Sequence, residues 1–180
     1  MNFESNHLIF REFVYEDWKP TFAYQNDKNF LKFYPESHRS ESDVQSLITL
    51  FVNWQNQIPR KNYQLALILK SSNKLIGNAG LRKSKTKKQV SEIGLEIDPK
   101  YWGQGLATQA MKSVLEFGFK ELKLEAIEGF CNPKNTAILH IASKLYMSKL
   151  EIQENYRDAQ GNKNDDEMIK VIIYRDKVSS

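Results

Sequence analysis

Apolar and polar positions along the chain predict helices and strands in a mixed order. Residues 7–13 read as a first strand because apolar and polar residues alternate there. Residues 14–25 and 40–57 follow as two helices. Ser40 or Ser42 can cap the second of them, and its apolar residues recur at helical spacing: Val44, Leu47, Ile48, Phe51 and Val52. The chain therefore opens with a strand followed by two helices.

The middle of the chain predicts a hairpin and one further strand. Residues 64–69 and 74–81 are apolar runs of strand length, and the segment "SSN" between them has turn chemistry. A polar loop covers residues 82–89. The next strand, residues 90–97, ends at Asp98 and Pro99.

Beyond these residues the apolar period changes to that of a helix starting near Thr108, with a stripe through Met111, Leu115, Phe119 and Leu122. A strand is expected at residues 124–131 and a helix at 135–147. Two final strands, 149–158 and 167–176, are joined by a polar loop. The order β-α-α-β-β-β-α-β-α-β-β predicts an α/β (α+β) domain and excludes a repeating βαβ wheel or a helical bundle.

Composition and charge narrow the class of protein without identifying it. A length of 180 residues suits one domain, residues 1–180, with a sizeable core. The net charge of +4 is too small to argue for nucleic acid. The single cysteine, Cys131, excludes an intrachain disulfide and fits a reducing compartment. Neither a signal peptide nor a membrane-spanning run is evident, so we expect a soluble, cytoplasmic protein.

The stretch "DPKYWGQGLATQAM", residues 98–111, places two glycines between a predicted strand and a predicted helix. The first N–H groups of a helix lack intrahelical partners, and the helix dipole adds positive charge there. Gly103 and Gly105 lack a Cβ, so a phosphate could approach the backbone closely. The amides that could bind it belong to Gln104, Gly105, Leu106, Ala107 and Thr108. The alternative is a tight turn that needs glycine only for its geometry.

Other phosphate-binding motifs fit this stretch poorly. A dinucleotide fingerprint needs glycine where Thr108 stands, and a Walker loop needs Gly-Lys-Ser/Thr, which is absent. The predicted ligand is a phosphate-bearing cofactor of another kind.

The segment "SEIGLEIDPKYWGQGLATQAMKSVLEFGF" resembles the acyl-CoA-binding core of the GNAT superfamily of N-acetyltransferases, in particular its RimJ/RimL-like branch. "HLIFREFVYED" resembles the opening strand of that family. "NPKNTAILHIASKL" resembles its second motif. The resemblance extends over nearly the whole chain. It implies a single GNAT-like fold, with a mixed, mostly antiparallel sheet of about six to seven strands, about four flanking helices and a splayed central strand pair.

The resemblance also implies acetyl-CoA as co-substrate, with no metal. The pyrophosphate would lie on the turn at residues 103–108, and the pantetheine arm would hydrogen-bond to backbone near Leu95 and Ile97. Both residues could equally be core, since the implied contacts are main-chain. Asn135, at the usual asparagine of the second motif, could contact the cofactor, cap its helix, or do both.

Acetyl transfer needs a neutral amine and a stabilised thioester oxygen. The resemblance favours Glu92 as the base, acting directly or through water. Strand alternation places Glu92 with Gly94 and Glu96, opposite Leu95 and Ile97, so Glu96 is the second candidate. Either carboxylate could instead be an ordinary surface or edge residue.

The second motif departs from the family at two positions. Ile138 stands where the branch usually has Ser, and Ala142 where other members have Tyr. A proton donor to the thiolate is therefore not evident. Tyr146 could serve, but it fits a buried aromatic better, and the thiolate could also leave unassisted. Cys131 could form an acyl-enzyme, although a lone cysteine at a strand end fits a small buried side chain better.

The resulting prediction is a CoA-dependent N-acetyltransferase that acts by direct transfer. Its partner is a primary amine, either a protein N-terminal α-amine or a small molecule, and a homodimer is possible. We expect neither nucleic acid nor membrane as a partner. The acceptor site is expected at residues 18–34 and 155–167. The alternatives are a CoA-binding module without catalysis and a nucleic-acid-binding domain that uses the basic run 82–88.

Overall fold

The computed structural model describes residues 1–33, 39–84, 87–153 and 167–177. Its helices are α1 (Trp18–Gln25), α2 (Glu41–Trp54), α3 (Leu106–Lys120) and α4 (Thr136–Lys144), with short 3-10 turns η1 (Tyr15–Asp17), η2 (Pro99–Tyr101) and η3 (Arg175–Lys177). Its strands are β1 (Asn2–Glu4), β2 (Leu8–Glu12), β3 (Asn62–Leu69), β4 (Lys74–Lys83), β5 (Val90–Ile97), β6 (Ala126–Cys131), β7 (Ser148–Gln153) and β8 (Met168–Tyr174).

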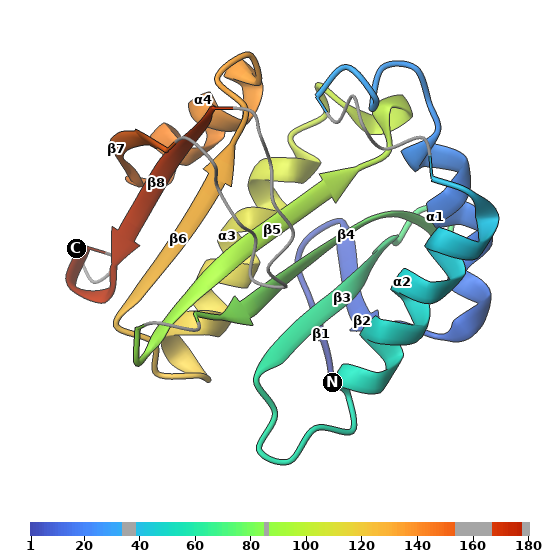
Figure 1. The fold of residues 1–180 in the computed structure, drawn as a ribbon, viewed down its shortest axis with the longest axis horizontal. Coiled ribbons are helices and arrows are strands. Elements are labelled where there is room, and N and C mark those ends of the chain that lie inside the picture. Colours follow the sequence, from blue (N-terminus) through green and yellow to red (C-terminus); the bar gives the residue numbers. More distant parts are fainter. Residues whose placement is uncertain (34–38, 85–86, 154–166, 178–180) are drawn as a thin grey trace. The chain divides into compact units, whose positions relative to one another are not determined.

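Within these ranges the eight strands form one sheet in the order β1-β2-β3-β4-β5-β6-β8-β7 (Figure 1). The pairs β1–β2, β2–β3, β6–β8 and β7–β8 are antiparallel, and β5–β6 is parallel. The predicted fold class, a mixed and mostly antiparallel sheet with four helices, is confirmed.

The sequence pattern missed the first strand. β1 spans only Asn2–Glu4, which is too short to show a period. It is fixed by its partner strand instead, because Phe3 pairs with Phe10 and their rings stack at 4.4 Å. The predicted strand 149–158 is described as far as Gln153, and the rest of it lies outside the described residues.

The chain divides into two compact units, and the division passes through β4, β5 and α3. The first unit contains Met1–Gly80 and Leu95–Met111, and the second contains Leu81–Gly94 and Lys112–Ser180.

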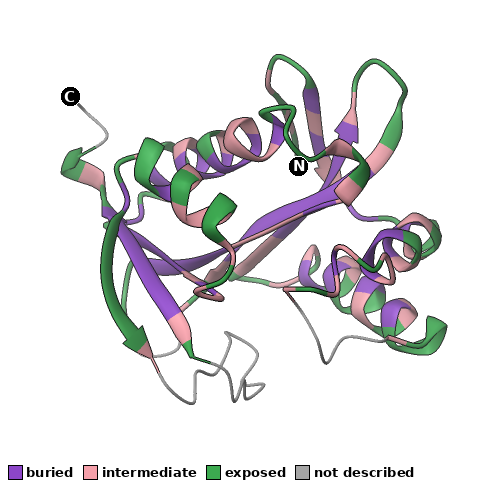
Figure 2. Cartoon of the chain, turned by 90° about the horizontal axis from the view of Figure 1, so that it is seen from above, coloured by how far each residue is buried: buried purple, intermediate pink, exposed green. Residues whose placement is uncertain are grey.

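The first unit is built around helix α2 and the strands that it covers. Ser40, and not Ser42, caps α2. The Ser40 hydroxyl accepts a hydrogen bond from the Asp43 amide at 3.2 Å, and the Asp43 carboxylate accepts one from the Ser40 amide at 2.8 Å. The helix carries buried residues on one side and exposed residues on the other (Figure 2). The buried side forms a core with residues of the opening strands, comprising Phe13, Val44, Ile48, Phe51, Trp54, Ala66 and Ile68.

The second unit is built around β6, which lies between β5 and β8. A Cβ at Gly118 of α3 would approach Ile127 Cδ1 to 2.7 Å and Leu81 Cδ1 to 2.8 Å, so α3 packs closely on this part of the sheet. The parallel pairing of β5 with β6 runs from Val90–Ala126 to Glu92–Glu128 and ends there. Among the described residues of the chain, no helix is both long enough and apolar enough to cross a bilayer.

Candidate functional site

The turn between β5 and α3 is fixed by local hydrogen bonds of the first unit. Pro99 begins the short turn η2, and the Asp98 carboxylate accepts the Lys100 amide at 3.0 Å. The indole Nε1–H of Trp102 donates to the Ile97 carbonyl at 2.8 Å, and its ring packs 6.0 Å from Phe33. These contacts set the direction in which the chain leaves β5.

Two glycines complete the turn in a conformation that other residues rarely adopt. Gly103 has φ +74° and Gly105 has φ +75°, both in the left-handed region. A Cβ built at either position would meet nothing within 4 Å, so the glycines are required by backbone conformation and not by crowding. The space above them is open, and residues Trp102–Gly105 are exposed.

Helix α3 begins directly after Gly105. The Gln109 amide donates to the Gly105 carbonyl at 3.1 Å, so the amides of Leu106, Ala107 and Thr108 belong to the first turn of the helix. Amides at these positions have no acceptor within their own helix. They lie beside an exposed, uncovered segment of backbone, which is the geometry of an anion site.

Gln109 ties this helix start to the N-terminal segment. Its Oε1 accepts the Ser5 hydroxyl at 2.8 Å and the His7 amide at 2.9 Å, and its Nε2 lies 3.2 Å from His7 Nδ1. These partners are 104 and 102 residues away in the sequence, so no local pattern could have indicated them.

Glu96 of β5 lies in a polar cluster of the first unit. Its Oε2 accepts three hydrogen bonds, from the Tyr24 hydroxyl at 2.9 Å, from Gln25 Nε2 at 2.9 Å and from Asn78 Nδ2 at 2.8 Å. All three donors are neutral and nearly fully buried, whereas Glu96 is half-buried. Sequence reasoning missed these donors, although Asn78 stands out as a polar residue in the otherwise apolar, buried middle of β4.

A second layer orients the three donors. Gln64 Nε2 donates to Asn78 Oδ1 at 2.6 Å, and Arg39 Nη1 donates to Gln25 Oε1 at 3.5 Å. Burial, followed by the negative charge of Glu96, raises the pKa of Tyr24 well above its usual value near 10. The hydroxyl therefore keeps its proton and remains a donor.

Glu92, four residues earlier on the same strand, has different surroundings in the second unit. Its carboxylate forms an ion pair with Arg82, at 3.1 Å between Oε1 and Nη2, and both side chains are largely buried. The Arg82 guanidinium also lies over Gly94, where a Cβ would come within 2.4 Å of Nη2. The charge of Glu92 is thus compensated by its neighbour.

Asn135, in the second unit, caps α4. Its Oδ1 accepts the Ile138 amide at 3.2 Å, so the helix-cap alternative is confirmed. A contact between Asn135 and a cofactor remains a prediction, as do the cofactor contacts of Leu95, Ile97 and the turn.

Comparison with known proteins assigns the family. Residues 7–148 match the model of the acetyltransferase (GNAT) domain. The chain belongs to the GNAT acetyltransferases. The matched model is that of the RimJ/RimL-type family, as the sequence resemblance indicated.

Individual relatives agree with this assignment. An uncharacterized N-acetyltransferase of Bacillus subtilis (strain 168), YnaD, is 30% identical over 149 residues, which cover 83% of this chain and 84% of that protein. The crystal structure of a GNAT acetyltransferase from Bacillus anthracis is 25% identical, with a TM-score of 0.79 and coverage of 98% and 99%. A spermidine N-acetyltransferase from Vibrio cholerae, solved with CoA and spermine, has a TM-score of 0.78 at 16% identity, with coverage of 98% and 100%, which shows the fold alone.

Two side chains that could take part in this acetyltransferase's chemistry are now placed. Tyr146 is 80% exposed and has φ +60°, so the prediction of a buried aromatic is wrong. The chain leaves α4 through this left-handed residue, which turns the ring outward. Cys131 is buried, and its burial raises the pKa of the thiol to about 11, which disfavours the reactive thiolate.

Segments predicted to wall the acceptor site are only partly described. Residues 34–38 and 154–166 lie outside the described ranges. Phe30 is buried and packs edge-on against Tyr24, with ring centroids 5.5 Å apart. In the basic run 82–88, Arg82 and Lys87 form ion pairs with Glu92 and Glu128, while residues 85–86 lie outside the described residues.

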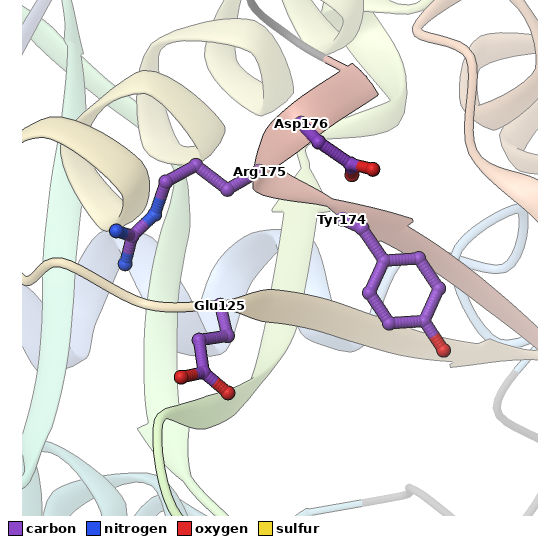
Figure 3. Close-up of a pocket in the computed structure, with 4 residues that line it drawn as sticks. All are labelled: Glu125, Tyr174, Arg175 and Asp176. Carbon is purple, nitrogen blue, oxygen red and sulfur yellow. The ribbon is translucent and has the colours of Figure 1, made fainter.

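A surface pocket of the second unit contains none of the predicted site residues. It is lined by Glu125, Tyr174, Arg175 and Asp176 (Figure 3). The Arg175 guanidinium donates to the main-chain carbonyls of Leu124 and Lys123. It therefore holds the segment after β8 against the residues that precede β6. We assign the pocket no part in acetyl transfer.

Proposed function

We propose that this protein transfers the acetyl group of acetyl-CoA directly to a primary amine. The observation that supports this most is the exposed turn at Gly103 and Gly105, which opens over the first amides of α3 in a chain of the GNAT family. Members of the family use acetyl-CoA and acetylate amines of proteins or of small molecules. The acceptor of this chain is a protein N-terminal α-amine or a small-molecule amine.

Coenzyme A fits the turn for electrostatic and steric reasons. Main-chain amides of residues 103–108 would hold the diphosphate, since the helix start is positive and a Cβ at Gly103 or Gly105 would meet nothing within 4 Å. Leu95 and Ile97 would offer main-chain groups to the pantetheine arm. The Ile97 carbonyl already accepts a hydrogen bond from the Trp102 indole. Asn135 would add a contact beyond its role as helix cap.

Bound acetyl-CoA supplies the reactive thioester. The neutral amine forms the new C–N bond with the acetyl carbon while the C–S bond breaks, and the electron pair leaves with sulfur. The nitrogen then loses a proton, which passes to the thiolate or to water. Direct transfer is favoured because Cys131 is buried with a raised thiol pKa and is a poor nucleophile.

Glu92 and Glu96 are the candidate catalytic carboxylates. Arg82 Nη2 occupies Oε1 of Glu92 at 3.1 Å, so a water molecule would carry the proton from the amine to this carboxylate. Among the described residues, Glu96 accepts hydrogen bonds from three neutral donors and forms no ion pair. Neither carboxylate needs to act as an acid, because a thiolate can leave without protonation.

The decisive experiment is a calorimetric titration with CoA. Wild-type protein should bind CoA, and Gly105→Ala should bind about tenfold more weakly, because the left-handed conformation costs other residues about 1–2 kcal/mol. Gln104→Ala is the matched control, since it removes an exposed side chain and keeps every main-chain amide. No heat with wild-type protein, or equal affinity in both variants, would contradict the proposed turn.

A second candidate is a CoA-binding module without catalysis. Ile138 and Ala142 occupy positions where the family usually has Ser or Tyr, and Tyr146 is exposed. Release of free thiol from acetyl-CoA, measured with a panel of primary amines, separates the two functions. CoA binding without thiol release on any amine would favour the module.

A further inference from the structure

We propose that Glu96 binds the acceptor in its ammonium form, through Oε1, while Tyr24, Gln25 and Asn78 hold the carboxylate in place through Oε2. This inference rests on the proposed function, and it specifies a cationic primary amine as the substrate class. Glu96 is then a recognition residue that contacts substrate. The three donors are positioning residues, because they act through Glu96.

The two oxygens of the Glu96 carboxylate differ in the hydrogen bonds that they accept. Oε2 accepts three hydrogen bonds at 2.8 to 2.9 Å. Within the described part of the chain, Oε1 accepts none. Glu96 is half-buried, whereas its three donors are almost fully buried, so the residue lies at the margin of the buried polar cluster.

The negative charge of Glu96 has no cationic partner among the described residues. Among the described residues, no Lys, Arg or His forms an ion pair with Glu96, and Arg39 is hydrogen-bonded to Gln25. Partial burial removes water from a carboxylate, and this desolvation costs free energy when all of its partners are neutral. A cation that pairs with the carboxylate offsets this cost. A substrate ammonium would offset it, and a neutral alcohol would not.

The three donors of Glu96 are themselves held in position by hydrogen bonds. Gln64 fixes the amide of Asn78, and Arg39 fixes the amide of Gln25, so each donor points its N–H at Glu96. The Tyr24 hydroxyl donates to Glu96 and accepts from Asn78 at 2.8 Å. A carboxylate held on one side in this way loses little freedom when a cation binds on the other.

Pairing with a carboxylate favours the charged form of an amine. Glu96 therefore acts in recognition and not in deprotonation, and its loss should raise KM for the amine more than it lowers kcat. The effect should also shrink as pH rises toward the amine pKa, about 10.4 for a lysine-type amine, because the ammonium then disappears. Among the described residues, the other ionisable side chains of the cluster are Tyr24 and Arg39.

The kinetic test compares Glu96→Gln with wild-type protein on the amine of the panel that is acetylated fastest. We expect KM for the amine to rise about tenfold or more, as for the loss of one charge-assisted hydrogen bond, with KM for acetyl-CoA unchanged. Glu116→Gln is the matched control, because Glu116 is a partly exposed carboxylate of α3 that pairs with Lys120 at 3.7 Å. A lower kcat with unchanged KM for the amine would identify Glu96 as a base and overturn the inference.

Positioning is tested by a double-mutant cycle. Tyr24→Phe alone should raise KM for the amine about threefold through the loss of one neutral hydrogen bond to Glu96. In the Glu96→Gln background the same change should have no further effect. Additive effects in the two backgrounds would show that Tyr24 acts only through packing and would overturn its positioning role.

A binding measurement makes the inference independent of turnover. Calorimetric titrations with spermine and with propylamine at pH 7, on protein saturated with CoA, should show binding to wild type and to Glu116→Gln, and about tenfold weaker binding to Glu96→Gln. Equal binding to Glu96→Gln, or no binding of either amine to wild type, would overturn the inference. Binding through Glu96 without acetyl transfer would instead keep the inference and overturn the proposed function.

Discussion

Two carboxylates of strand β5 lie four residues apart and have opposite surroundings. Glu92, in the second unit, faces a guanidinium at 3.1 Å, and Glu96, in the first, faces a hydroxyl and two amides. The first carboxylate is electrostatically complete within the protein. The second forms no ion pair among the described residues, and its Oε1 is the oxygen to which we assign the substrate ammonium.

This difference underlies our proposal that Glu92 is the structural carboxylate of the strand and Glu96 the one that contacts substrate. Environment, and not residue identity, decides which carboxylate can take up a charged ligand. We therefore expect Glu92 to matter more for stability and Glu96 to matter more for the acceptor. The following predictions test that division, beginning with the largest effect.

Removing the Glu92 side chain should strongly destabilise the protein. Glu92→Ala leaves the largely buried Arg82 guanidinium without its carboxylate, and breaking a buried ion pair in this way costs about 3–5 kcal/mol. Glu96→Ala should cost clearly less, because its donors Tyr24 and Asn78 still bond to each other. Urea denaturation of both variants measures the difference.

The control removes both members of the pair. Arg82→Met with Glu92→Leu removes both charges of this pair, so it should recover most of the stability lost in Glu92→Ala. If Glu96→Ala proves the more destabilising of the two single variants, the assignment of structural and functional carboxylates is reversed.

This division could not have been predicted from the sequence. The periodicity of apolar residues predicted seven of the eight strands and all four helices, because each of these elements buries one face. The partners of Glu96 lie on α1 and β4, and Gln109 meets residues that are more than 100 positions away. Such contacts depend on which elements meet in the folded chain, and no local pattern encodes them.

The turn was predictable for the opposite reason. A strand, a proline, two glycines and a helix follow one another within 14 residues, and left-handed backbone at both glycines is a local property. Tyr146 shows the limit of local reasoning. Its aromatic ring suggested burial, but a left-handed backbone at the end of α4 turns it to the surface.

The second prediction concerns the reactivity of the Cys131 thiol. An acyl-enzyme at this thiol would replace the direct transfer in which the two carboxylates are candidates. With a thiol pKa of about 11, Cys131 should react with iodoacetamide at pH 8 about a hundredfold more slowly than an ordinary cysteine thiol of pKa about 8.5. Mass spectrometry of timed samples measures the rate. Cys131→Ser should keep kcat, and a stable acetyl adduct on Cys131 would contradict direct transfer.

Tyr24 provides the third prediction and tests the charge of the Glu96 cluster. Burial and Glu96 raise the pKa of this phenol in the folded protein, so the folded state keeps a proton that the unfolded state loses above about pH 10. The contribution of Tyr24 to stability is therefore complete below that pH. It falls with rising pH by up to about 1.4 kcal/mol per pH unit until the folded pKa is reached.

The measurement compares the pH dependence of unfolding in wild-type protein and Tyr24→Phe. The wild type should lose stability more steeply between pH 9 and 11, since the other tyrosines contribute equally to both curves. Glu96→Gln should lie between them, because it removes one of the two causes of the shift and keeps the burial. Parallel curves for wild type and Tyr24→Phe would mean that the phenol ionises as freely in the folded state as in the unfolded one.

The smallest expected effect is that of substitutions at Asn135. They test whether this residue of the second unit contacts the cofactor. Asn135→Ala should cost about 1 kcal/mol of stability, because the Ile138 amide loses its cap at the start of α4. Asn135→Ser keeps a capping oxygen and should retain nearly full stability. CoA titration of the Ser variant then isolates the ligand contact from the cap. Weaker CoA binding at unchanged stability would give the second unit, which already holds the compensated carboxylate, a direct part in binding. Unchanged affinity would leave the predicted cofactor contacts to the turn and to β5, in the same unit as Glu96.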